Sequence, residues 1–214
     1  MSESIDPITV RRLKDADWPE FRRVRLAALG ESPEAFSATL AEEEASDEAS
    51  WLERVQRSPR FLAESGGAVV GMASLGRYQG AEGESENSGE LYGLWVTPAL
   101  RGTGVATALV NAASRQASDD GRSHVVYWVS TSNGRAVAFA SGLGFRPTDD
   151  RRPMRGVGHA DEEEIAMTLP LGLDRGSPIA RVCVRARPPG RTAYRIAFRC
   201  AASVPVRGLC RPSS

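Results

Sequence analysis

Short apolar runs separated by turn residues predict most of the strands of this chain. Residues 8–13 alternate apolar and polar side chains, which is the period of a strand with one buried face. Residues 60–64 and 68–76 form two more such runs, and Gly66-Gly67 between them is typical of a hairpin turn. Further strands are predicted at residues 91–96 and 125–129, from Phe145 onward, and at residues 165–169.

Apolar residues at helical spacing predict helices between these strands. The first helix follows Asp15 and Asp17 and ends at Gly30, and more helical material is predicted over residues 35–45 and 51–55. Later helices are predicted over residues 104–118 and 133–142. Strands alternating with helices after a hairpin favour an α/β fold with a mixed sheet of six or seven strands and helices on both faces.

Charge divides the chain into two parts. The formal net charge of zero hides nine arginines and one acid from Gly172 onward, so residues 1–171 carry a net charge of −8 and residues 172–214 one of +8. We expect residues 1–171 to be one catalytic domain. The remaining segment is an Arg/Pro-rich tail with few large apolar residues, and disorder is its expected state.

Targeting and metal-binding signals are weak. The N-terminus has neither the basic nor the apolar region of a signal peptide, and no segment has the ~20 apolar residues of a membrane-spanning helix. The three cysteines lie in the tail at spacings that match no metal site. We therefore expect a cytoplasmic protein without a metal or a membrane partner.

The most informative segment runs from a predicted strand into a helix, around Arg101-Gly-Thr-Gly-Val-Ala106. Gly102 and Gly104 permit positive φ and a close backbone approach. The amides from Thr103 to Thr107 have no partner within the helix, so they point outward at the positive end of its dipole. This arrangement suits a diphosphate, with Arg101 at its rim. A nucleotide-binding module is disfavoured because the Lys of a Walker loop and the third Gly of a Rossmann motif are missing.

Two motifs resemble the GNAT N-acetyltransferase superfamily. Arg101-x-x-Gly104-x-Ala106 is similar to the central motif of that superfamily, and Asn133-x-x-Ala136-x-x-Phe139 followed by Gly144-Phe145 is similar to a second one. The resemblance covers residues 8–171. It implies a sheet splayed at its centre, where the strand at residues 125–129 leaves the one at residues 91–96 to admit pantetheine.

The resemblance also implies acetyl transfer from acetyl-CoA to a primary amine by direct attack. Backbone groups would do most of the binding: amides of the turn for the diphosphate, the main chain at Trp95 and Val96 for pantetheine, and Asn133 near pantetheine. The cofactor-binding residues expected on this basis are Trp95, Val96, Arg101, Gly102, Thr103, Gly104, Val105, Ala106, Thr107 and Asn133.

One position departs from the family pattern. Many members carry a tyrosine four residues before Gly144, where it protonates the departing thiolate, but this chain has Ala140 there. A CoA thiol is about as acidic as cysteine, so its departure without such help is tolerable chemistry. The alternative is a non-catalytic acyl-CoA sensor with a degenerate active site.

Glu90 is the candidate general base. It opens the central strand, and the resemblance implies that a strand carboxylate at this place removes the amine proton. An exposed strand end after an acidic loop is an equally good interpretation of Glu90. Tyr92 is on the same face two residues later and is a second candidate, which could order a water molecule.

The partners remain open at this stage. Acidic clusters at residues 42–44, 82–86 and 161–164 are either solvated surfaces or a field that attracts a cationic amine. The acceptor is an unidentified small molecule or a protein N-terminus. No nucleic-acid-binding motif is present, so nucleic acid is not expected as a partner, and a homodimer is one open assembly.

Overall fold

A computed structural model describes residues 6–79, 87–154 and 162–172. These residues form seven strands and five α-helices. The tail proposed for residues 172–214 lies outside the described residues, apart from Gly172. The strands are β1 (Thr9–Arg12), β2 (Arg60–Ser65), β3 (Ala68–Arg77), β4 (Ser88–Val96), β5 (His124–Ser130), β6 (Arg146–Pro153) and β7 (Glu163–Pro170), and the α-helices are α1 (Trp18–Glu31), α2 (Leu40–Glu44), α3 (Glu48–Arg57), α4 (Val105–Asp119) and α5 (Gly134–Gly142).

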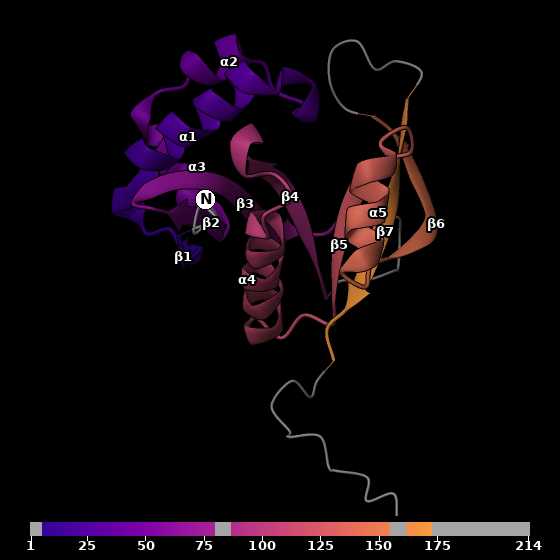
Figure 1. Ribbon diagram of the computed structural model, residues 1–214. Helices are drawn as coiled ribbons and strands as arrows, with labels where there is room; N and C mark the ends of the chain where they lie inside the picture. Colours follow the sequence, from indigo (N-terminus) through magenta and orange to yellow (C-terminus); the bar gives the residue numbers. More distant parts are fainter. Residues whose placement is uncertain (1–5, 80–86, 155–161, 173–214) are drawn as a thin grey trace, which may run out of the picture. The chain divides into compact units, whose positions relative to one another are not determined.

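All seven strands belong to one sheet in the order β1-β2-β3-β4-β5-β7-β6. Only β4 and β5 pair in parallel, and the helix α4 makes the crossover between them (Figure 1). The other neighbours are antiparallel. The mixed sheet predicted from the sequence, with its number of strands, is confirmed.

The sheet has hydrophobic clusters on both faces. On one face, α4 packs against side chains such as Phe61, Ala63 and Ala73, and α5 packs against β5 in the same cluster. On the other face, α1 and α3 pack against Leu62 and Met72, which alternate with them along the same strands. The helices therefore cover both faces, as the alternation of elements predicted.

The helical region before β2 differs from its prediction. The sequence predicts a helix over residues 35–45, whereas the structure has a 3₁₀ turn at Pro33–Ala35 and a short α2 that starts only after Thr39. Phe36 between them is extended, and Thr39 forms a capping box with Glu42 that fixes the start of α2. This break matters for function because it lets Phe36 and Ser37 line a cavity.

Candidate functional site

The two central parallel strands separate part of the way along their length. Pairing runs from Ser88 with His124 to Leu91 with Tyr127, and the remaining residues of β4, from Tyr92 to Val96, have no partner in β5. Figure 1 shows β4 and β5 diverging toward one end. The splay predicted for the centre of the sheet is therefore confirmed.

A β-bulge accompanies the start of this separation. The register between β3 and β4 shifts by one residue between Met72 and Ser74, and Gly93 on the bulged strand has a φ of +61°. A bulge bends its strand and is commonly built on a glycine at positive φ. The bulge therefore accounts for the bend of β4 away from β5. Sequence reasoning missed Gly93, although a glycine inside a strand pattern is a known signal for a bulge.

The start of α4 presents free backbone amides, as predicted. Gly104 caps the helix with a φ of +98° and without a side-chain hydrogen bond. Ala108 is the first residue whose amide donates along the helix, to the Gly104 carbonyl at 3.0 Å. Within the described part of the chain, the amides of Gly102, Gly104, Val105, Ala106 and Thr107 have no acceptor. Thr103 differs, because its amide contacts the Leu100 carbonyl at 3.4 Å and its hydroxyl donates to the same oxygen at 2.7 Å.

Arg101 lies beside these amides, but its guanidinium is held by the protein. It donates to the Val96 carbonyl at 3.1 Å and to Glu31 and Ser32 at the end of α1 at 3.0 and 3.1 Å. Hydrogen bonds from Ser32 and from the Trp95 indole lower the pKa of Glu31. In this structure Arg101 therefore joins the end of β4 to α1, and its charge is shared with Glu31.

The main chain of Val96 faces the gap, whereas that of Trp95 does not. Trp95 pairs with Met72, and the amide of Thr97 donates to Val70 on β3 at 2.9 Å. Hydrogen-bonded and non-hydrogen-bonded pairs alternate along antiparallel strands, so Val96 between them turns its amide away from β3. Of the two residues expected to pair with pantetheine, the geometry supports Val96, and the Trp95 main chain is already used by the sheet.

Asn133 has a structural task at the start of α5. Its side-chain oxygen accepts from the Ala136 amide at 3.0 Å, which is the bond of an N-cap. The motif that suggested a position near pantetheine therefore also encodes this cap.

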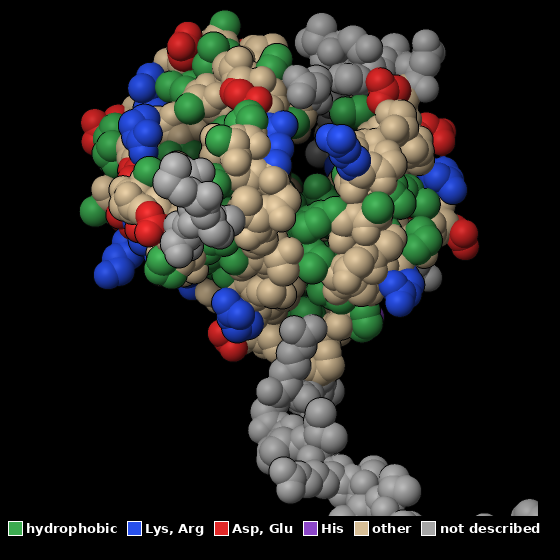
Figure 2. Space-filling model, in the orientation of Figure 1, with side chains coloured by type: hydrophobic (Ala, Val, Ile, Leu, Met, Phe, Trp, Pro, Cys, Tyr) green, Lys and Arg blue, Asp and Glu red, His purple; other side chains and the backbone are tan. Residues whose placement is uncertain are grey.

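Figure 2 shows the face of the molecule that carries α4 and α5. The surface is hollowed between these helices, with hydrophobic side chains along the hollow and Lys or Arg side chains at its upper end. An apolar channel with a basic end matches the chemistry of pantetheine and its diphosphate.

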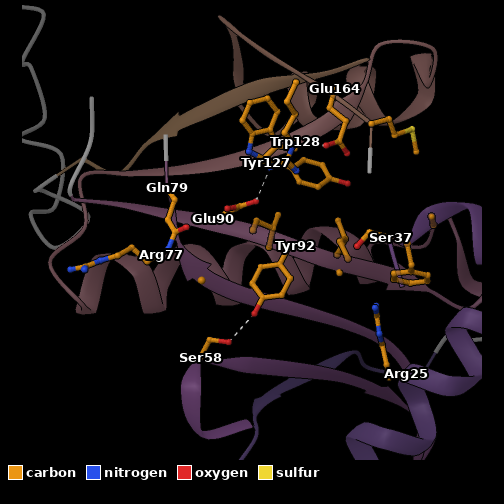
Figure 3. A pocket seen from close by; sticks show the side chains of 18 of the residues that line it. Arg25, Ser37, Ser58, Arg77, Gln79, Glu90, Tyr92, Tyr127, Trp128 and Glu164 are labelled. Carbon is orange, nitrogen blue, oxygen red and sulfur yellow. Dashed lines mark hydrogen bonds and ion pairs between the residues drawn. The ribbon is translucent and has the colours of Figure 1, made fainter. Parts of the chain in front are cut away.

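A cavity of about 600 Å³ opens along the parted strands. Both candidate catalytic residues, Glu90 and Tyr92, line it (Figure 3). It is lined by Arg25, Ala35, Phe36, Ser37, Arg57, Ser58, Gly76, Arg77, Gln79, Glu90, Leu91, Tyr92, Gly93, Leu94, Tyr127, Trp128, Arg152, Met154 and Glu164.

Glu90 lies in a small network of charges on the wall of this cavity. Arg152 contacts Glu90 at 3.6 Å and Glu164 at 2.6 Å, and its guanidinium stacks on the Trp128 ring at 4.1 Å. The side chain of Glu90 is 21% exposed, so it is neither a surface carboxylate nor sealed in the core. Two carboxylates share this guanidinium, and Arg77 lines the same cavity.

Tyr92 points away from this network. Its hydroxyl is 2.8 Å from the Ser58 hydroxyl, as Figure 3 shows. Glu90 and Tyr92 therefore both line the cavity, as expected for residues on the same face of the strand. The Tyr92 hydroxyl, however, is directed toward Ser58, the residue that follows α3.

Ala140 is fully buried in the core between α5 and the sheet. The position therefore contributes packing and no proton donor. A different tyrosine lies at the point where the strands separate: Tyr127 is the last residue of β5 that pairs with β4, and it lines the cavity. Its ring packs edge-on against Phe145 with centroids 6.2 Å apart. Sequence reasoning missed Tyr127, because its relation to the gap depends on the strand register.

The acidic clusters of the sequence have different environments. Glu43 is buried and contacts both Arg25 and Arg54. Glu164 is paired with Arg152, and residues 82–86 lie outside the described residues. The carboxylate of Glu43 is therefore neutralised and does not provide a field for a cationic amine.

Comparison with known proteins gives the family to which this fold and site belong. The Acetyltransferase (GNAT) family matches residues 12–145. This protein belongs to that family.

Two curated relatives cover part of the chain. Mycothiol acetyltransferase of Thermobispora bispora is 34% identical over 141 residues, which cover 60% of this chain and 48% of the relative. An uncharacterized N-acetyltransferase of Methanocaldococcus jannaschii is 33% identical over 95 residues, which cover 44% of this chain and 42% of the relative. The chain thus spans about half the length of these relatives.

Solved structures agree in fold. The yncA protein of Salmonella typhimurium, solved with acetyl-CoA, has a TM-score of 0.60 at 22% identity, and the match covers 81% of this chain and 98% of that one. A ribosomal-protein-alanine N-acetyltransferase of Brucella melitensis has a TM-score of 0.59 at 24% identity, over 76% and 99% of the two chains. At these identities the likeness establishes the fold.

Neither a membrane span nor a metal cluster is found in the part of the chain that the structure describes. No helix there is long and apolar enough to cross a bilayer. No group of three or more His, Cys, Asp or Glu side chains there has the arrangement of a metal site.

Proposed function

We propose that this protein is an N-acetyltransferase that moves an acetyl group from acetyl-CoA to a primary amine by direct attack. One observation carries the proposal: the unbonded amides at the start of α4 lie beside two parallel strands that separate after Leu91 and Tyr127. The amides suit a diphosphate, and the gap suits the pantetheine arm that leads to the thioester. The relatives named acetyltransferases support the same class of reaction.

The residues divide the work by their positions. The amides of Gly104, Val105 and Ala106 bind the diphosphate, and the Val96 amide pairs with pantetheine. Glu90 accepts the proton of the attacking amine, directly or through a water molecule. Acetyl-CoA supplies the activated thioester.

Tyr127 is the proton donor that we propose for the departing thiolate. It lines the cavity at the separation of the strands, and burial raises the pKa of its phenol to about 12. The hydroxyl therefore stays protonated at the pH of any ordinary assay and can donate to the departing thiolate. The position of Tyr127 supplies the donor that the buried Ala140 cannot.

Tyr127→Phe is expected to lower kcat about tenfold and to leave KM for acetyl-CoA nearly unchanged. The effect is smaller than the usual 10²- to 10⁴-fold for a general acid because the thiol is itself acidic. The shape of the pH–rate profile below about pH 10 stays the same, since Tyr127 does not titrate there. Steady-state kinetics with free-thiol detection measure this, and an unchanged kcat would remove Tyr127 from the mechanism.

Alkaline unfolding gives a readout of Tyr127 that is independent of activity. Its folded pKa of about 12 lies above the ordinary value of 10.0, so its burial stabilises the protein fully below pH 10. That contribution is lost as the pH rises from about 10 through about 12. Relative to the Tyr127→Phe variant, the wild type should lose stability across this range, and parallel melting curves for the two proteins would contradict the burial of the phenol.

A non-catalytic acyl-CoA sensor is the second candidate, and the buried Ala140 favours it. Binding and turnover separate the two functions. Thermal-shift titration with acetyl-CoA, ATP and NAD tests the ligand class, and only acetyl-CoA should stabilise the protein. Release of free thiol over a panel of primary amines then identifies an enzyme, whereas tight acetyl-CoA binding with no release for any amine identifies a sensor.

A further inference from the structure

A second cavity of about 310 Å³ adjoins the first, and basic residues dominate its walls. The two cavities share five lining residues: Arg25, Ser37, Arg57, Tyr92 and Gly93. Four arginines line the second cavity, and among its described lining residues Glu43 is the single acid. The basic residues that line it are Arg25, Arg54, Arg57 and Arg60.

Arg60 is a buried cation without a carboxylate partner. The residue is 6% exposed, and no acid of the described segments lies within ion-pair distance of it. Its guanidinium donates to the Arg54 carbonyl and to the Ser74 hydroxyl, both at 2.8 Å, and its second terminal nitrogen, which is not fully buried, has no protein acceptor in the described segments. The rings of Phe21 and Tyr92 lie 4.6 and 5.7 Å from the guanidinium carbon.

The nearby carboxylate is already engaged. Glu43 contacts Arg54 and, at 3.3 Å, Arg25, so its charge is shared between two guanidinium groups. Burial lowers the pKa of both Arg25 and Arg60, which reflects the cost of keeping these charges away from water. The cavity therefore keeps a strong excess of positive charge inside a domain whose net charge is −8.

A buried charge without a counter-ion is costly, and proteins normally pair it. Here the terminal nitrogen of Arg60 that has no protein acceptor and the excess of guanidinium groups border an open cavity. An anionic group in that cavity would neutralise them and would make charge-assisted hydrogen bonds with the arginines. The arrangement is that of a binding site for a carboxylate or a phosphate.

The opposite wall carries both carboxylates and guanidinium groups. Figure 3 shows Arg25 on one side of Tyr92 and Glu90 and Glu164 on the other. Between them lies the bulge at Gly93, where a Cβ added to the glycine would be 3.9 Å from an outer nitrogen of Arg25. The joined cavities thus offer several guanidinium groups at one end and, beside the parted strands, the carboxylates of Glu90 and Glu164 next to Arg152.

We infer that the acceptor is a primary amine that also carries a carboxylate or phosphate group, with the anion in the cavity lined by Arg25, Arg57 and Arg60 and the amine beside Glu90. This inference rests on the proposed function for the role of the amine. The anion site does not depend on the proposed function, because it is argued only from the arginines that line the cavity.

Binding of simple anions tests the site without turnover. The thermal shift of the protein is titrated with inorganic phosphate and with acetate, in saturating CoA so that the diphosphate site is filled. We expect saturable stabilisation of the wild type by at least one anion, and an apparent Kd raised about tenfold or more in Arg57→Gln and in Arg60→Met. Arg23→Gln is the control, because its side chain is 65% exposed and Arg23 lines neither cavity, and it should behave as the wild type.

The stability of the variants without anion gives a second readout. Replacing an unneutralised buried charge by an apolar side chain of similar length often stabilises a protein, so Arg60→Met should melt at a higher temperature than the wild type in anion-free buffer. Should Arg60→Met fail to fold, Arg57→Gln, at an exposed position, decides the question by its anion affinity. Equal anion shifts in the wild type and in the folded variants would overturn the inference.

Matched amines test the inference as a statement about the substrate. Phosphoethanolamine is compared with ethanolamine, and glycine with glycinamide, by release of free thiol from acetyl-CoA. We expect about 10- to 100-fold higher kcat/KM for at least one anionic member, and the difference should disappear in Arg57→Gln. The two pairs also distinguish a phosphate from a carboxylate.

The outcomes separate this inference from the proposed function. Equal turnover of both members of each pair would overturn the inference and leave the acetyltransferase standing. If no amine in the panel is acetylated, the anion titration still decides the inference. Absent acetyl-CoA binding, with anion binding that depends on Arg57 and Arg60, would remove the proposed function and leave the anion site.

Discussion

Glu90→Gln should lower kcat by about 10²- to 10⁴-fold, the range for loss of a general base. The substitution keeps the size of the side chain and removes its ability to accept a proton. Arg152 keeps its 2.6 Å contact with Glu164, so the cavity wall should stay intact. Steady-state kinetics measure kcat, and a melting curve checks the fold.

The pH dependence makes this test specific. The active form of a general base is the ionised one, so the wild-type rate should fall at acid pH as Glu90 becomes protonated. The variant should lose that acid limb along with most of its rate. Glu163→Gln on the wall strand β7 is the control, because its side chain is exposed and lines neither cavity. A Glu90→Gln enzyme with the wild-type rate and profile would exclude Glu90 as the base.

Gly104→Val should weaken acetyl-CoA binding by about 100-fold. Gly104 has a φ of +98°, a conformation that a β-branched residue adopts only with strain. Relaxation of that strain turns the amides at the start of α4. Two charge-assisted hydrogen bonds at about 1.5 kcal/mol each correspond to roughly this loss. Isothermal titration calorimetry with acetyl-CoA gives the Kd.

The opposite end of the same helix provides a matched control. Gly121 has a φ of +74°, and at Gly121, as at Gly104, an added Cβ would meet no atom within 4 Å. Gly121→Val therefore introduces a similar backbone strain at a site without a ligand. Both variants should lose a similar amount of stability, but only Gly104→Val should lose affinity. Equal affinities in the two variants would contradict the role of the α4 amides.

The elements of the fold could be predicted because their signals are local. Apolar runs or alternation located six of the seven strands, whereas β6 is polar and was predicted only as a strand from Phe145 onward. Helical spacing located α1, α4 and α5. The break at Phe36 was missed, since the predicted helix ignored the capping box of Thr39 and Glu42. Local capping chemistry overrode helix propensity there.

The binding turn could also be predicted, because its chemistry belongs to the backbone. Two glycines before a helix fix the direction of the amides whatever the surrounding side chains are. The set of side chains that line the cavity was harder to predict. Tyr127 and Arg152 enter the cavity through strand register, which sequence spacing alone does not give.

The charged residues give a second example, because counting them along the sequence does not show where they lie in the structure. The acidic clusters at residues 42–44, 82–86 and 161–164 left open a field for a cationic acceptor. The structure instead places Arg25, Arg57 and Arg60 around a joined cavity and engages Glu43 with arginines. Local pairing decides what a ligand meets, and a sum over residues does not contain that information.

The amides at the start of α4 can be observed directly. In ¹H–¹⁵N NMR spectra of the protein titrated with CoA, the account predicts the largest shift changes and slowed hydrogen exchange at Gly104, Val105 and Ala106, with no change at Gly121. Binding of CoA with these three amides unshifted would contradict the central claim that they hold the diphosphate.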